Sequence, residues 1–199
     1  MKSKNGFVEM IKNAGILFAI TLIAGLALGF VNELTKEPIA YQQELKVQRA
    51  CAAVFDDAAS FEAIPATGGS QGNGVEIGTV FKALAGDGTL LGYVINTTSS
   101  EGYGGDISLM MGVRMDGTVN GISLLAIAET PGLGMQAGDV LVPQYAGKNV
   151  PSFIYTKSGA VNDNEIDAIS GATVTTAAVN NAVNGGLTYF NNTLKEGGN

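Results

Sequence analysis

The sequence predicts an α+β protein, in which an N-terminal transmembrane helix precedes a domain built on an antiparallel sheet with flanking helices. Two observations carry this prediction. Residues 14–31 form an uncharged apolar run, and from residue 79 onward strand-length runs rich in β-branched residues are separated by short glycine turns. A run of that length can span a bilayer, and strands joined by tight turns pair antiparallel because parallel pairs need long crossovers.

The composition of the 199-residue chain excludes several classes of partner and of catalytic or metal site. The chain carries a net charge of −7 at pH 7, one cysteine and no histidine. The acidic balance argues against nucleic acid as a partner, because neutralising phosphates needs clustered Lys and Arg. Without histidine, the chain cannot use serine or cysteine catalysis through histidine or build a His-type zinc site. With one cysteine, it cannot form an intramolecular disulfide or a four-thiolate iron–sulfur cluster. Redox or group-transfer chemistry would therefore need a borrowed cofactor.

The apolar run predicts a membrane anchor over residues 14–34, with residues 1–13 in the cytoplasm. The 18-residue core is about 27 Å long at 1.5 Å per residue, close to the hydrocarbon thickness. Lys2, Lys4 and Lys12 precede it, and Glu33 and Glu37 follow it. The positive-inside rule then places the rest of the chain outside the cytoplasm. A cleaved signal peptide is the alternative, but the run is longer than an ordinary signal core.

The segment after the anchor predicts a connecting helix over residues 35–62. Apolar positions recur with a loose helical spacing, and Pro38 suits a first helical turn. Cys51 lies in this pattern as a small core or surface residue, and the polar residues just before it argue against lipid attachment. The Gly-rich residues 64–78 predict a surface loop at the start of the main domain, which we place at 63–199.

The middle of the chain predicts a meander of antiparallel strands. Tight turns at 86–88 and 116–117 join neighbouring runs. The predicted strands are Thr79–Leu84, Leu90–Thr97, Ile107–Arg114 and Val119–Ala128.

The last third of the chain predicts short elements followed by a final helix. Residues 138–147 fit a short helix or irregular segment, 152–156 a further strand, and 176–194 a final helix with an apolar stripe. Gly185 and Gly186 inside this helix would be tolerated if it packs closely on the sheet.

Residues 167–173, Asp-Ala-Ile-Ser-Gly-Ala-Thr, form a hydroxyl-rich turn at the start of that final helix. Backbone N–H groups at a helix start lack intrahelical partners, and the helix dipole adds positive charge, so this place favours a phosphate. Thr173 would present its hydroxyl there. A plain helix cap is the alternative, because Ser, Gly and Thr are also common caps.

Two glycine clusters interrupt the strands, at residues 101–106 (Glu-Gly-Tyr-Gly-Gly-Asp) and 129–134 (Glu-Thr-Pro-Gly-Leu-Gly). Each allows close approach of the backbone to a ligand, and each alone is also compatible with an ordinary turn. Neither is a dinucleotide fingerprint, because no strand–turn–helix unit with a downstream acid surrounds it.

The motif at 167–173 resembles the flavinylation motif of the covalent FMN-binding domain family, an Asp-x-x-Ser/Thr-Gly-Ala-Thr run that ends in the modified threonine. The clusters at 129–134 and 101–106 resemble two further hallmarks of that family. The anchor, the domain size and the order of the three motifs resemble the RnfG component of the Rnf electron-transport complex. The NqrC component of the sodium-translocating NADH:quinone reductase is a related alternative, although it is usually longer.

The resemblance implies an extracytoplasmic FMN-binding domain. Thr173 would carry FMN as a phosphoester, attached by a separate magnesium-dependent flavin transferase that recognises Asp167. Tyr103 would be a stacking partner of the flavin ring. The remaining residues assigned to the cofactor site surround the phosphate (Ser170, Gly171, Ala172, Thr175, Thr176) or line the ring and ribityl chain (Glu129, Thr130, Gly132, Leu133, Gly134).

The resemblance also implies partners and a function. The chain would pass electrons between neighbouring membrane subunits of a complex that couples ferredoxin and NAD⁺ chemistry to Na⁺ or H⁺ movement. By itself it would have no complete activity, no catalytic residue and no metal. An anchor whose core holds no charge is also unsuited to conducting ions alone. The other hypothesis is an anchored binding or scaffold domain, in which the turn at 167–173 is only a helix cap.

Overall fold

The computed structural model describes residues 3–66, 69–72 and 74–195. These fall into two compact units, residues 1–45 and 46–199. The first unit is the greater part of helix α1, Ser3–Val54. Within the described residues, one helix is long and apolar enough to cross a membrane, and its most apolar 18-residue window is not buried against any other part of the chain.

Helix α1 corrects two predictions about the region after the anchor. It runs without interruption through Pro38, which therefore lies inside the helix and does not begin a new one. Proline removes one backbone hydrogen bond there, but good helix formers on both sides outweigh that loss. The predicted connecting helix was also too long, because α1 ends at Val54 and Ser60–Ile64 form strand β1.

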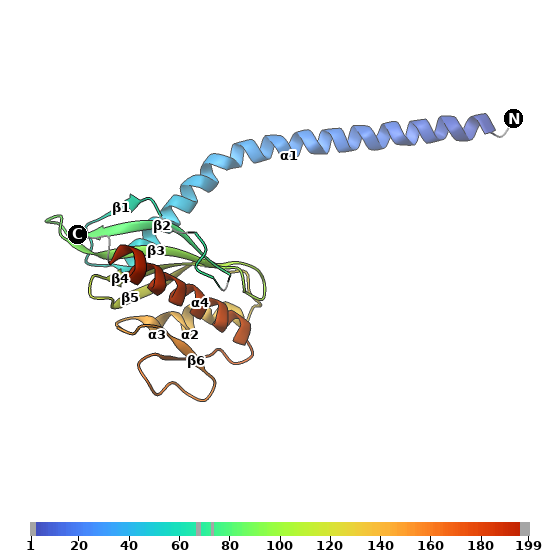
Figure 1. The fold of residues 1–199 in the computed structure, drawn as a ribbon. Coiled ribbons are helices and arrows are strands. Elements are labelled where there is room, and N and C mark those ends of the chain that lie inside the picture. Colours follow the sequence, from blue (N-terminus) through green and yellow to red (C-terminus); the bar gives the residue numbers. More distant parts are fainter. Residues whose placement is uncertain (1–2, 67–68, 73, 196–199) are drawn as a thin grey trace. The chain divides into compact units, whose positions relative to one another are not determined.

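The second unit is built on a five-stranded antiparallel sheet in the order β1-β2-β3-β4-β5, which confirms the predicted meander (Figure 1). The strand bounds after β1 are Val75–Leu84 (β2), Leu90–Ser99 (β3), Ile107–Arg114 (β4) and Val119–Ala126 (β5). Strand β2 begins at Val75, inside the segment predicted as loop. Its register shifts between Ile77 and Val80, and this irregularity hides the alternation that reveals a strand.

Each face of the sheet is covered by a helix. The last turns of α1 pack on one face, where Cys51, Val54 and Phe55 are buried against Val94 and Met110. Cys51 is thus a core residue. Burial of this short apolar stretch joins the end of α1 to the sheet domain.

Helix α4, Thr173–Tyr189, covers the other face and contributes to the larger core (Figure 1). It packs very closely on the sheet, as its two glycines predict. A Cβ atom on Gly185 would lie 2.6 Å from Cγ1 of Val75, and one on Gly186 would overlap the side chain of Met111. The helix starts three residues before the predicted 176 and ends in a π-helical turn, Phe190–Leu194.

Short elements connect the sheet to α4. Two one-turn helices, α2 (Ala137–Val140) and α3 (Val142–Tyr145), lie in the region predicted as helical or irregular. Strand β6, Ile154–Thr156, pairs in parallel with β7, Glu165–Asp167. The 167–173 motif therefore begins at the last residue of β7 and ends at the first residue of α4.

The segment before β6 is fixed to α4 by two asparagines. Nδ2 of Asn180 and Nδ2 of Asn184 both donate to the carbonyl oxygen of Phe153, at 3.0 and 2.8 Å. Oδ1 of Asn184 accepts from the N–H of Phe153 at 2.7 Å. These contacts hold the β6–β7 unit, and with it the start of the motif, in a fixed position relative to the helix that follows it.

Candidate functional site

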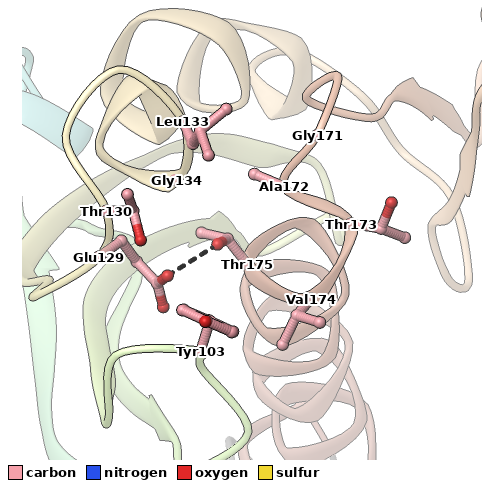
Figure 2. A pocket seen from close by; sticks show the side chains of 10 residues that line it. All are labelled: Tyr103, Glu129, Thr130, Leu133, Gly134, Gly171, Ala172, Thr173, Val174 and Thr175. Atoms are coloured by element: carbon pink, nitrogen blue, oxygen red, sulfur yellow. Dashed lines mark hydrogen bonds between the residues drawn. The ribbon is translucent and has the colours of Figure 1, made fainter.

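All three motifs meet at one cavity of about 400 Å³ at the N-terminus of α4 (Figure 2). Its volume lies within the range of cofactor sites, about 300–1,000 Å³. The cavity is lined by residues from three segments that are distant in the sequence: Tyr103 from the first glycine cluster, Glu129, Thr130, Leu133 and Gly134 from the second, and Gly171, Ala172, Thr173, Val174 and Thr175 from the helix start.

The first turn of α4 has no side-chain cap. Ala172 occupies the N-cap position and makes no side-chain hydrogen bond. Among the described residues, the backbone N–H groups of Thr173, Val174 and Thr175 have no partner, whereas the N–H of Thr176 donates to the carbonyl oxygen of Ala172 at 3.0 Å. Three N–H groups and the positive end of the helix dipole thus remain available to an anion. The alternative interpretation of the turn as a plain side-chain cap is not supported.

Thr173 is the first residue of α4, and its half-buried side chain lines the cavity. Its hydroxyl takes part in no hydrogen bond with the part of the chain that the structure describes, and the chain has no histidine that could act as its base. An unactivated threonine is a weak nucleophile. Among the described residues, Thr173 therefore has no hydrogen-bonded base with which to modify itself.

Glu129 is the one buried carboxylate of the cavity, with 7% of its surface exposed. Its Oε2 accepts a hydrogen bond from Oγ1 of Thr175 at 3.0 Å, and its Oε1 accepts from the N–H of Gly104 at 3.2 Å. Figure 2 shows the Glu129–Thr175 contact, with Tyr103 drawn below it in this view. The two bonds offset the cost of burying a charge and join both glycine clusters to α4.

Gly134 and Gly104 lie where neighbouring atoms leave no room for a side chain. A Cβ atom on Gly134 would lie 2.5 Å from Oγ1 of Thr175 and 2.7 Å from Cβ of Glu129. A Cβ atom on Gly104 would overlap the carbonyl oxygen of Ala128. Packing alone therefore requires a glycine at these positions in both clusters, whether or not a ligand binds.

Tyr103 projects from the loop 101–106 and is 75% exposed, although it lines the cavity. A second contact ties this loop to α4, because Nδ2 of Asn181 donates to Oε2 of Glu101 at 2.8 Å. Leu133 and Val174 add apolar side chains that are 42% and 49% exposed. The mouth of the cavity thus offers an apolar and aromatic surface suited to a planar ring.

Four residues assigned to the site from sequence lie outside the cavity lining. Ser170 is exposed on the turn before α4, and Gly132 is exposed with a φ of 76°. Thr176 is fully buried, and its hydroxyl donates to the carbonyl oxygen of Ala172 and accepts from the N–H of Ile169. Its one proton is used within the turn, so in this arrangement it cannot donate to a phosphate.

Asp167, the fourth of these residues, is exposed but held in place. Its N–H donates to Oε1 of Gln144 at 2.6 Å, its carbonyl oxygen accepts from Nε2 of Gln144 at 3.1 Å, and its Oδ1 accepts from the N–H of Ala160 at 2.6 Å. These contacts order the first residue of the motif at the protein surface. Its role in recognition stays a prediction.

Sequence reasoning missed three residues that build the site: Val174, which lines the cavity, and Gln144 and Asn181, which hold its loops. Val174 lies between two motif threonines, so its position in the first helical turn is a signal that could have identified it. Nothing in the local sequence marks Gln144 or Asn181. Among the described residues, no group of three or more His, Cys, Asp or Glu side chains could hold a metal ion.

Comparison with known proteins gives two family matches. Residues 102–188 match the FMN-binding domain, and residues 1–54 match the RnfG N-terminal region. The chain is 33% identical to the G component of the Na(+)-translocating ferredoxin:NAD(+) oxidoreductase complex of Acetobacterium woodii, over 90% of this chain and 91% of that one. It is 28% identical to the G component of the ion-translocating oxidoreductase complex of Methanosarcina acetivorans, over 91% and 94%.

Among solved structures, NqrC of Shewanella oneidensis aligns with a TM-score of 0.48 and 25% identity, covering 57% of this chain and 59% of that one. The relatives that match over nearly their full length, together with the two family matches, decide the assignment. With an FMN-binding domain behind an RnfG-type N-terminal helix, the chain belongs to the RnfG family of Rnf complex components.

Proposed function

We propose that this chain is the membrane-anchored flavin subunit of an ion-translocating ferredoxin:NAD⁺ oxidoreductase complex, and that it carries FMN joined through the phosphate to Thr173. Family membership and the FMN-binding domain support a flavin subunit for electron transfer. The observation that carries the attachment is the start of α4. There the helix N-terminus is uncapped, and Thr173, whose hydroxyl has no partner among the described residues, is one of the residues that line the cavity where all three motifs meet.

The residues present fit the cofactor. The unpartnered N–H groups of residues 173–175 would stabilise the phosphoester charge by about 0.3–1 kcal/mol through the helix dipole. Tyr103, Leu133 and Val174 would contact the flavin ring, and Thr130 and Gly134 the ribityl chain. Bound FMN would supply electron transfer, which the side chains of this protein do not provide.

Attachment would be the work of a separate flavin transferase. Oγ1 of Thr173 would attack the phosphorus on the flavin side of FAD, forming the Thr–phosphate bond while AMP leaves. The hydroxyl proton would pass to a base of the transferase, since the chain has no histidine. Asp167, ordered and exposed at the start of the motif, would be part of the surface that the transferase reads.

The apolar part of α1 would anchor the protein in the membrane as a single span. The lysines before the apolar run favour a cytoplasmic N-terminus and an FMN domain outside. A covalent tether would keep the flavin from diffusing away in that compartment. The other membrane subunits of the complex would supply and accept the electrons.

The test is flavinylation of the full chain co-expressed with a flavin transferase. The denatured wild-type protein should fluoresce on a gel at its own mass and gain the mass of FMN less one water on the intact chain. Thr173→Val should abolish both signals, and Thr188→Val, which changes an exposed threonine at the far end of α4, should retain them.

A dark wild-type band with no added mass would overturn the covalent proposal and favour the scaffold hypothesis. A fluorescent Thr173→Val band would show that another residue is modified. Co-purification with the neighbouring subunits distinguishes an Rnf complex from the related quinone reductase.

A further inference from the structure

We propose that Glu129 is a positioning residue. Its buried carboxylate fixes the Tyr103 loop, residues 101–106, against the first turn of α4 and so keeps the Tyr103 ring in place as a wall of the cavity. The part of this proposal that concerns the flavin rests on the proposed function. Sequence reasoning places Glu129 against the cofactor itself, whereas the geometry points to a role exerted through the protein.

Both oxygens of the Glu129 carboxylate are engaged by the protein. Oε1 accepts from the N–H of Gly104, and Oε2 accepts from the hydroxyl of Thr175. The residue follows β5, its first partner lies 25 residues earlier and its second 46 residues later, so one side chain connects three distant segments. The side chain is almost fully buried, and its bond to Thr175 is buried, so loss of the carboxylate leaves the Thr175 hydroxyl without this partner.

The Tyr103 side chain has little support of its own. It is 75% exposed, and its hydroxyl makes no hydrogen bond with the described residues. The ring position is therefore set by the backbone of the loop. That backbone is fixed at Gly104 by Glu129 and at its start by the exposed Glu101–Asn181 contact. Of these two anchors, the Glu129 contact is at the residue next to Tyr103 and is part-buried, whereas the Glu101–Asn181 contact is exposed.

The geometry predicts that a neutral amide can replace the carboxylate. In Glu129→Gln, the amide oxygen can still accept from the N–H of Gly104, and the amide nitrogen can donate to Oγ1 of Thr175 after the hydroxyl turns. Glu129→Ala loses both contacts and leaves the Gly104 N–H without a partner. Rescue by Gln separates the positioning role from any direct effect of negative charge on the cofactor.

The first test uses the full-length chain purified without the transferase, so it does not depend on flavin. Amide hydrogen exchange in the 101–106 loop should be about tenfold faster in Glu129→Ala, because one backbone hydrogen bond is lost, and should stay near wild type in Glu129→Gln. Asp106→Ala, which removes an exposed carboxylate from the same loop, is the matched control and should leave Gly104 exchange unchanged. Unchanged exchange in Glu129→Ala would overturn the proposal.

The second test uses the flavinylated chain and combines Glu129→Ala with Tyr103→Leu. If Glu129 acts through Tyr103, each single variant raises flavin fluorescence and weakens the visible circular dichroism of the flavin. The double variant then shows no more change than Tyr103→Leu alone. Additive changes, or a failure of Glu129→Gln to restore the wild-type spectrum, would overturn the positioning role. A wild-type chain without flavin would overturn the proposed function instead, while the exchange test would still decide how the loop is held.

Discussion

The hydroxyl of Thr175 donates a hydrogen bond to the carboxylate of Glu129 at 3.0 Å and thereby joins the second glycine cluster to the first turn of α4. Both side chains are almost fully buried, with 1% of Thr175 and 7% of Glu129 exposed. The contact explains why the helix start and two loops from distant parts of the sequence form one cavity wall. The backbone N–H groups of residues 173–175 have no partner among the described residues, because the N-cap residue, Ala172, has no side-chain acceptor.

Replacing Thr175 with Val should destabilise the domain although the two side chains have nearly the same shape. The change leaves a buried carboxylate oxygen of Glu129 without its partner, at a cost of about 1–3 kcal/mol. The measurement is the free energy of unfolding of the full chain in detergent, from denaturant titration. Thr173→Val is the control and should stay within about 0.5 kcal/mol of wild type, because Thr173 has no such bond. Equal effects would contradict the assignment.

Replacing Gly134 with Ala should also destabilise the domain, here through overlap. The added Cβ would press on Oγ1 of Thr175 and Cβ of Glu129, and overpacking of a buried site costs about 1–3 kcal/mol. Gly138→Ala is the matched control, because a Cβ at that position in α2 meets nothing within 4 Å and its φ is not positive. Thermal unfolding of the two variants compares them directly. A Gly134→Ala chain as stable as Gly138→Ala would show that the loop relaxes freely.

The sheet could be predicted closely where turns bound the strands. The bounds of β4 agree at both ends, since a glycine cluster precedes it and Asp116-Gly117 follows it. Strand β1 could not be predicted, because in Ser60–Ile64 only Phe61 and Ile64 contact the core, and such a short edge strand has no clear period. Pro38 misled the prediction for α1 because its local preference for a helix start was overruled by the helix around it.

The three motifs predict which segments meet at the cavity, but not how their side chains are hydrogen-bonded. Short motifs name the segments that meet, and the residues of all three do line one cavity. No local pattern shows that Thr175 pairs with Glu129, or that the Thr176 hydroxyl is used within its own turn. Such assignments depend on which donor comes closest in the folded chain, and that is a property of tertiary packing.

Lowering the pH should loosen the β6–β7 loop next to the motif. Hydrogen bonds from the N–H of Val161, and then from the side chain and N–H of Asn162, hold the pKa of Glu165 below its usual value of 4.5. A depressed carboxyl pKa means that this support is complete above pH 4.5 and is lost as the pH falls through the lower folded value. Amide exchange at Val161 and Asn162 should therefore accelerate below pH 4.5 relative to the exchange rate of an unstructured peptide at the same pH.

Glu165→Gln should remove that extra pH dependence, because the amide has one acceptor oxygen and does not titrate. Asp163→Asn should preserve it, because the side chain of Asp163 lies in the same loop but accepts no hydrogen bond from the described residues. The same acid response in the Glu165→Gln chain would show that another group controls the loop.

A negative charge placed at Thr173 should stabilise the protein without any flavin, because the N–H groups at the start of α4 have no partner among the described residues. Thr173→Asp puts a carboxylate beside the unpartnered N–H groups of residues 173–175, and a charge at a helix N-terminus contributes about 0.3–1 kcal/mol. Thr173→Asn, nearly the same shape but neutral, is the reference. The difference in unfolding free energy between the two should shrink as salt is raised and disappear as the pH falls through the lowered pKa of the new carboxyl. If Asp is no more stabilising than Asn at low salt, the first turn of α4 would not favour the phosphate that we place there.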